Sequence, residues 1–127
     1  LEIFPDEIAR RQHVGERYTS SLSGLSKTIT PPHIAAANTS VYAQYTLRVP
    51  DRDGIQAALQ SEGIPTAIHY PIPLPRQPAF ADVRSATDSY REAEAASREV
   101  HSLPMHPYLD ASDQARVVEA IANAMQA

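Results

Sequence analysis

The chain has 127 residues, 43% of them hydrophobic, which suits one domain with a single core. Its formal net charge is −4 and its 11 basic residues are scattered, so no positive stripe is available for a nucleic acid backbone. The lack of cysteine excludes disulfides and thiolate metal sites, and no apolar run reaches membrane-spanning length. We therefore expect a cytoplasmic protein that binds neither nucleic acid nor membrane.

The first 25 residues predict a helix. Pro5, Asp6 and Glu7 are typical of a first helical turn, because proline needs no hydrogen-bond acceptor there and acids face the positive end of the helix dipole. A partly apolar stripe follows at steps of three and four residues, until Gly24 can end the helix. It consists of Ile8, Arg11, Gly15, Tyr18, Leu22 and Leu25. Because the pattern starts at once and without methionine, we expect a piece of a longer protein.

A proline-containing loop separates this helix from the first predicted strand. Residues 26–40 include adjacent prolines and many small residues, so we expect a loop with a short extended piece at 28–30. Over residues 41–49, the sequence VYAQYTLRV alternates between two faces, which is typical of a strand. Tyr42 and Tyr45 then lie on opposite faces, so at most one belongs to the core. The other is available to a partner or ligand, while a plain packing role is the favoured interpretation for each.

A helix and a second strand are predicted next. Asp51 can cap a helix whose apolar face includes Ile55 and Leu59 and which stops at Gly63. Residues 64–69 are the second strand candidate. A strand, a helix and a strand joined by short connections are typical of α/β or α+β domains, and this is the fold class that we predict.

The segment IHYPIPLPRQP, residues 68–78, contains four prolines. Each proline fixes φ and removes a backbone donor, so we predict a rigid loop rather than a helix or a central strand. A rigid loop after a strand can hold polar side chains in place for a ligand. We expect His69 and Tyr70 to have this role, with their side chains on opposite sides of the strand end. The alternative is that the imidazole caps the loop and the tyrosine ring packs beneath it.

The rest of the chain predicts two more helices. Residues 90–100 and 111–125 are rich in helix formers, and the prolines of the stretch 101–109 between them limit it to a short extended piece. Residues 81–89 are polar and small, so we expect a mobile loop there.

Other kinds of chemistry find little support in the sequence. His101 and His106 flank a turn that His69 could approach, but no HExxH spacing is present and the prolines between them prevent a shared helical face. The serines of TSSLSGLS lack the GxSxG elbow, and the four glycines form no phosphate-binding loop. We therefore predict no metal site and no catalytic residue in this chain.

Three segments in a fixed order carry a family resemblance: VYAQYTLRV, GIPTAIHYPIPLPRQPAF and SLPMHPYL. Together they resemble the carboxy-terminal part of the DegT/DnrJ/EryC1/StrS family of pyridoxal-phosphate-dependent sugar aminotransferases, and the resemblance covers nearly the whole chain. Within that family, PTAIHYPIPLPRQPA and SVYAQYT look most like enzymes that aminate the 3-keto group of a UDP-linked 2-acetamido hexuronic acid. Those enzymes serve O-antigen synthesis in lipopolysaccharide.

The resemblance implies a fold type I aminotransferase, in which a large domain binds pyridoxal phosphate through a lysine and a small domain closes over the substrate. Residues 1–25 would link the two domains, and residues 26–127 would be the small domain. Lys27 lies in a segment unlike the family's lysine motif, so we expect this chain alone to be inactive. The resemblance also implies glutamate as the amino donor and a homodimer.

The resemblance further implies which residues bind the substrate. His69 and Tyr70 match the histidine and tyrosine of the family's HYP segment, which lies near the bound nucleotide sugar. Arg76 and Gln77 are further candidates, since a guanidinium fits a carboxylate or phosphate, although a loop arginine is usually only solvated. A second interpretation is a non-catalytic module of the same fold that binds a nucleotide sugar or has a regulatory role.

Overall fold

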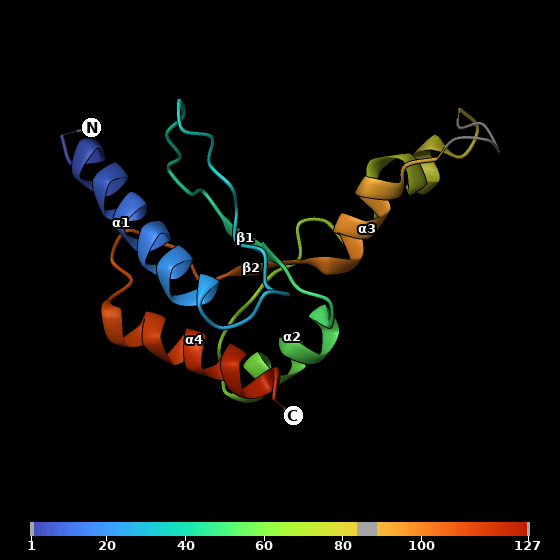
Figure 1. The fold of residues 1–127 in the computed structure, drawn as a ribbon. Helices are drawn as coiled ribbons and strands as arrows, with labels where there is room; N and C mark the ends of the chain where they lie inside the picture. The colour runs from blue at the N-terminus through green and yellow to red at the C-terminus, as the bar shows by residue number, and fades with distance from the viewer. Residues whose placement is uncertain (1, 84–88, 127) are drawn as a thin grey trace.

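The computed structural model describes residues 2–83 and 89–126, which form four α-helices and a small antiparallel sheet (Figure 1). In chain order the elements are α1 (Phe4–Ser23), β1 (Tyr45–Arg48), α2 (Arg52–Ser61), the 3₁₀ turns η1 (Leu74–Arg76) and η2 (Pro78–Phe80), α3 (Arg91–Glu99), β2 (Val100–Leu103) and α4 (Ala111–Ala124). α1, α2 and α4 surround the core, whereas α3 and the 3₁₀ turns η1 and η2 project away from it (Figure 1). The predicted mixture of helices and strands is confirmed.

Two strands form the sheet, and one bridging residue flanks each strand. β1 and β2 are antiparallel, with Tyr45 opposite Leu103. A single bridge joins Thr30 to Arg48 on the outer side of β1, and another joins Ala67 to Ser102 on the outer side of β2. The predicted extended piece at 28–30 therefore pairs with β1.

The second predicted strand, residues 64–69, is reduced to the bridge at Ala67, so this part of the prediction is wrong. Pro65 has no backbone donor and Pro71 fixes φ soon after the bridge, so only a short stretch can pair. The segment also pairs with β2 rather than with β1. Because both pairings of β2 are antiparallel, β1 and Ala67 run parallel with β2 between them.

The first predicted strand begins later than the alternation indicates. Tyr42 has a φ of 43°, in the left-handed region, and its carbonyl accepts a hydrogen bond from the Arg11 side chain at 3.2 Å. The alternation therefore breaks before Tyr45, which is fully buried. Tyr42 is partly buried and packs its ring against that of Tyr45 at 5.7 Å, so the two rings are not on opposite faces of a strand. Gly15 permits this packing, because a Cβ there would lie 2.5 Å from the Tyr42 ring.

The helices follow the local signals of the sequence. The Asp51 side chain accepts a hydrogen bond from the Gly54 amide at 3.1 Å and caps α2, as predicted. Gly63 has a φ of 71°, which matches its predicted place just after this helix. The described part of the predicted loop 81–89 has no helix or strand, and its residues 84–88 lie outside the described residues.

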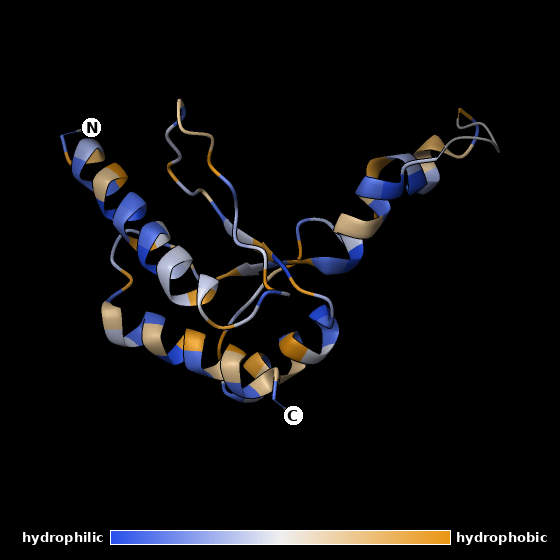
Figure 2. Ribbon diagram, viewed as in Figure 1, coloured by the Kyte–Doolittle hydropathy of each residue, from blue (hydrophilic) through white to orange (hydrophobic). Residues whose placement is uncertain are grey.

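The core lies between the helices and one face of the sheet. It consists of Val14, Tyr18, Leu22, Ile29, Tyr45, Leu47, Val49, Ile55, Leu59, Ile64, Leu103, Leu109, Val117, Ala120 and Ile121. Figure 2 shows apolar bands on α2 and α4, which are in contact, and a largely hydrophilic first half of α1. The second half of α1 is integral to the core, while Ile3 and Phe4 at its start are exposed. The division into a linking helix at 1–25 and a small domain at 26–127 stays a prediction.

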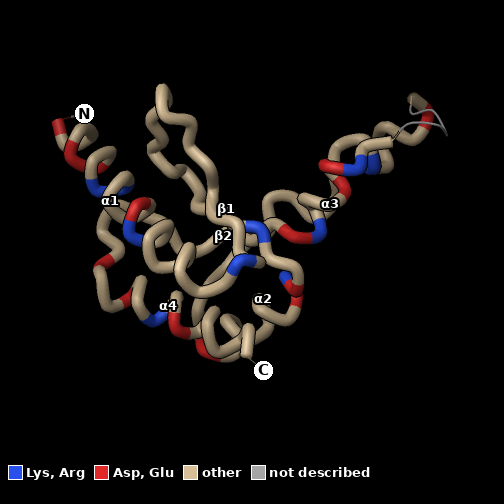
Figure 3. The backbone as a smooth tube through the Cα atoms, in the orientation of Figure 1, with Lys and Arg blue, Asp and Glu red and all other residues tan. Residues whose placement is uncertain are grey.

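Charged residues of both signs are interspersed. Figure 3 shows acidic and basic segments next to each other on α1 and α3. Among the described residues, no helix has the length and hydropathy needed to cross a membrane.

Candidate functional site

The two faces of the sheet have different surroundings. Because side chains alternate along a strand, Tyr45 and Leu47 point into the core. The opposite face presents Thr46, Arg48, Val100 and Ser102. The segment after Ala67 reaches this second face, which makes it the place to look for a site built by the proline loop.

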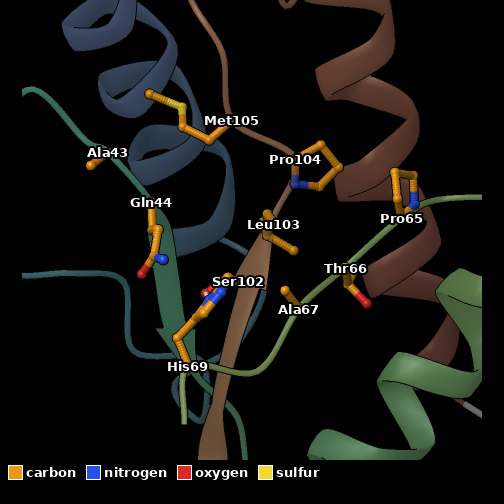
Figure 4. Close-up of a pocket in the computed structure, with 10 residues that line it drawn as sticks. All are labelled: Ala43, Gln44, Pro65, Thr66, Ala67, His69, Ser102, Leu103, Pro104 and Met105. Atoms are coloured by element: carbon orange, nitrogen blue, oxygen red, sulfur yellow. Dashed lines mark hydrogen bonds between the residues drawn. The ribbon is translucent and has the colours of Figure 1, made fainter.

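His69 is held against β2. The two backbone hydrogen bonds between Ala67 and Ser102, at 3.1 and 2.8 Å, anchor the chain two residues earlier. The half-buried His69 then places Nδ1 3.2 Å from the Ser102 Oγ (Figure 4). Its position is therefore set by backbone pairing and by a side-chain contact.

Tyr70 lies beside His69 rather than on the opposite side. The two rings meet edge to face with centroids 5.8 Å apart, and the peptide bond between the residues is cis. Tyr70 is 71% exposed. The expectation of opposite sides is wrong because residue 69 lies beyond the bridge at Ala67, where the chain bends and strand alternation no longer applies. At this exposure the Tyr70 ring is not packed beneath the loop, which was the alternative considered for it.

Two hollows meet at His69. The smaller one, of about 270 Å³, lies between His69, the end of β2 and Gln44 (Figure 4). The larger is a groove of about 590 Å³ that continues past Tyr70 to Gln77 and α3. Its apolar wall is formed by Ile72, Pro73, Leu74, Pro75, Ala93, Ala96 and Val100. Such a groove, mostly apolar with a few polar groups, is typical of a small-molecule site.

Three of the four predicted binding residues line this groove, namely His69, Tyr70 and Gln77. Arg76 does not, because its guanidinium Nε donates to the Glu94 carboxylate of α3 at 2.6 Å. That ion pair ties the proline segment to α3. The binding roles of all four residues stay predictions.

A second arginine near the groove is also paired with α3. The Arg48 Nε donates to Glu99 at 2.8 Å, on the sheet face that carries the site. Arg48 and Arg76 are thus each balanced by a glutamate. The groove therefore offers apolar contacts and hydrogen-bonding groups, without a free positive charge from these two arginines.

The sequence did not indicate two residues of the site, Thr46 and Ser102. The Thr46 Oγ1 lies 2.8 Å from the Ser102 Oγ, which in turn contacts His69. The only available signal was the polar position of Thr46 in the alternating strand. Nothing local indicates that a residue 56 positions away completes the contact.

His101 has a different environment from the one considered in the sequence analysis. It is fully buried opposite Leu47, and neither of its ring nitrogens has a hydrogen-bond partner among the described residues. Burial, with a smaller effect of the positive charge of Arg52, lowers the pKa of His101 to about 4. The imidazole is therefore neutral near pH 7. Among the described residues, no group of three or more histidine, aspartate or glutamate side chains could hold a metal ion.

Comparison with protein families finds that residues 1–122 match the DegT/DnrJ/EryC1/StrS aminotransferase family. The UDP-2-acetamido-2-deoxy-3-oxo-D-glucuronate aminotransferase of Pseudomonas aeruginosa is 46% identical over 97% of this chain and 33% of that protein. A pleiotropic regulatory protein of Geobacillus stearothermophilus is 40% identical over 89% of this chain and 30% of its own length.

Solved structures show the same likeness. A DegT DnrJ EryC1 StrS aminotransferase from Brucella abortus has a TM-score of 0.87 and 36% identity, covering 97% of this chain and 32% of that one. S. venezuelae DesV, solved in complex with a ketimine intermediate, has a TM-score of 0.90 and 32% identity, covering 97% and 33%. The predicted fold class is thereby confirmed. The chain spans about a third of the length of the curated relatives it matches.

Proposed function

The chain belongs to the DegT/DnrJ/EryC1/StrS aminotransferase family. We propose that it is the small domain, which closes over the substrate, of a pyridoxal-phosphate-dependent nucleotide-sugar aminotransferase. The proposed acceptor is the 3-keto group of a UDP-linked 2-acetamido hexuronic acid, and the proposed amino donor is glutamate. The reaction would serve O-antigen synthesis for lipopolysaccharide, in the cytoplasm. The observation that carries this proposal is the 46% identity to the P. aeruginosa enzyme along 97% of the chain.

The groove supports recognition of a sugar. His69, Tyr70 and Gln77 carry hydrogen-bonding groups, and they lie beside an apolar wall. Such a wall can pack against the apolar face of a ring while a few polar groups fix its orientation. The stiff proline segment loses little conformational entropy when a ligand binds, which favours affinity.

The residues of this chain do not fit covalent attachment of the cofactor. That cofactor is loaded through a Schiff base with a lysine. Lys27, the single lysine, is exposed in the turn after α1 and lines neither hollow at His69. We therefore assign no catalytic step to this chain and expect it to be inactive alone, with the cofactor site on another part of a homodimeric full-length protein. A borohydride-reduced cofactor adduct on Lys27 would contradict this.

The proposed acceptor can be tested by exchanging parts between relatives. The matching third of the P. aeruginosa enzyme is replaced by this chain, and formation of the 3-amino sugar from glutamate is measured. We expect the chimera to use the UDP-linked 3-keto hexuronic acid in preference to a dTDP-linked 3-keto sugar. Equal use of both acceptors by a chimera with a normal melting temperature would contradict the proposed substrate.

The name of the G. stearothermophilus relative favours a second candidate, a regulatory module that binds a nucleotide sugar without turnover. The two candidates differ in one measurement. With cofactor and glutamate present, the full-length protein makes an amino sugar under the first proposal. Binding of the nucleotide sugar without product would favour the second.

A further inference from the structure

Three polar side chains from separate segments form a hydrogen-bonded chain at the centre of the site. The Thr46 Oγ1 on β1 lies 2.8 Å from the Ser102 Oγ on β2, and Ser102 Oγ lies 3.2 Å from the His69 Nδ1. Figure 4 shows the His69 side chain reaching from its loop towards Ser102. The three residues connect the sheet to the junction of the two hollows.

Ser102 is the best fixed of the three. It stands directly opposite Thr46 in the sheet register, and it is bridged through its own backbone to Ala67 on the other side. Ser102 is only 5% exposed, so water has little access to compete for its hydroxyl. The Oγ position is therefore set by the sheet on both sides.

The hydrogen atoms of the Thr46 and Ser102 hydroxyls decide in which direction the two hydrogen bonds run. Each hydroxyl has one hydrogen to donate. If the His69 Nδ1 donated to Ser102, Ser102 would donate to Thr46, and the Thr46 hydrogen would need a further acceptor. Within residues 2–83 and 89–126, the structure shows no other partner for the partly buried Thr46 hydroxyl, so its hydrogen would be left to solvent. The opposite direction, from Thr46 to Ser102 to Nδ1, uses both hydrogens.

We propose that Thr46 and Ser102 are positioning residues that hold His69 as the neutral tautomer with its hydrogen on Nε2. Because Nδ1 accepts from Ser102, the imidazole has a single free donor, Nε2–H, at the junction of the hollows. A neutral N–H can donate to a neutral oxygen of the sugar, such as a carbonyl or hydroxyl, and it supplies no positive charge for a phosphate. The identity of that oxygen rests on the proposed function, whereas the tautomer does not.

The tautomer is tested directly by nuclear magnetic resonance of the chain labelled with ¹⁵N-histidine, since the nitrogen shifts distinguish a protonated from an unprotonated ring nitrogen. The His69 signals are assigned by their loss in His69→Gln. We expect the hydrogen on Nε2 in the wild type at neutral pH. Ser102→Ala should shift His69 towards a mixture of tautomers, and Thr46→Val should do so while nearly preserving side-chain shape. Thr46→Ser keeps the hydroxyl and is the matched control.

The outcomes separate clearly. A hydrogen on Nδ1 in the wild type overturns the proposal, as does a His69 signal unchanged in a folded Ser102→Ala. An unchanged signal in Thr46→Val removes Thr46 from the proposal. If Ser102→Ala does not fold, judged by its melting temperature, Thr46→Val decides the question.

Kinetics of the full-length aminotransferase supply the functional arm. Ser102→Ala and Thr46→Val should lower kcat/KM for the keto sugar by about two- to tenfold, mainly through KM, because a misplaced donor weakens one uncharged hydrogen bond. Thr46→Ser should stay close to the wild type, and the glutamate half-reaction should change little in all three. If His69→Ala leaves the sugar half-reaction unchanged, the proposed role of His69 in sugar recognition fails, while the tautomer measurement still decides the positioning role.

Discussion

Replacing His101 by leucine should reduce the acid sensitivity of the fold. His101 is fully buried, and its ring nitrogens have no partner among the described residues. A proton on this imidazole would place a charge in the core, and the positive charge of Arg52 would add a smaller repulsion, so the pKa is lowered to about 4. Leucine has a similar volume and does not titrate, so it preserves the packing while it removes this cost.

The magnitude follows from the pKa. A fall from 6.5 to about 4 corresponds to roughly 3 kcal/mol between the two protonation states. Above pH 6.5 the imidazole is neutral in both the folded and the unfolded chain and has no effect on pH dependence. As the pH falls from 6.5 towards 4, the unfolded chain binds a proton that the folded chain excludes, so the free energy of unfolding decreases. At about pH 4 and below, the fold has lost this entire contribution of roughly 3 kcal/mol to the free energy of unfolding.

The assay is urea denaturation followed by circular dichroism between pH 4 and 7.5, for the wild type, His101→Leu and the exposed control His33→Gln. We expect the wild type and the control to lose roughly 3 kcal/mol more than His101→Leu over this range. Asp110 does not confuse the result, because its hydrogen bonds to the Asp113 amide and to Ser112 lower its pKa below 3.8. Parallel curves for wild type and His101→Leu would refute the reasoning.

Three further predictions concern packing, capping and recognition. Gly15→Ala should lower the free energy of unfolding by about 1–3 kcal/mol in urea titration, because its Cβ would meet the Tyr42 ring, whereas Gly24→Ala has nothing within 4 Å and should not destabilise in this way. Asp51→Ala should lower the same quantity by about 1 kcal/mol through loss of the α2 cap; an unchanged urea midpoint would contradict the capping role. In the full-length enzyme, His69→Ala should lower kcat/KM for the nucleotide sugar by roughly ten- to a hundredfold, with far less change in the glutamate half-reaction; equal loss in both would contradict sugar recognition.

Much of the local structure was determined by the sequence itself. α1, α2 and α4 were predicted because their signals, such as the Asp51 cap and the stop at Gly63, act between residues only a few positions apart. The proline segment was predicted to be neither an α-helix nor a strand, and it forms only short 3₁₀ turns, because proline restricts its own φ whatever surrounds it. His69, Tyr70 and Gln77 were chosen from this segment and do line one groove.

The tertiary structure alone decided how these pieces meet. β2 was expected only as a short extended piece, and its pairing with β1 joins residues more than 50 positions apart. The same pairing places Ser102 next to Thr46 and in contact with His69, and it points the His101 side chain towards the core. The pairing of Arg76 with Glu94, 18 positions later, likewise removed a predicted binding residue from the groove. Strand alternation tells which side chains share a face, but not which strand lies alongside, because pairing partners distant in sequence leave no periodic signal.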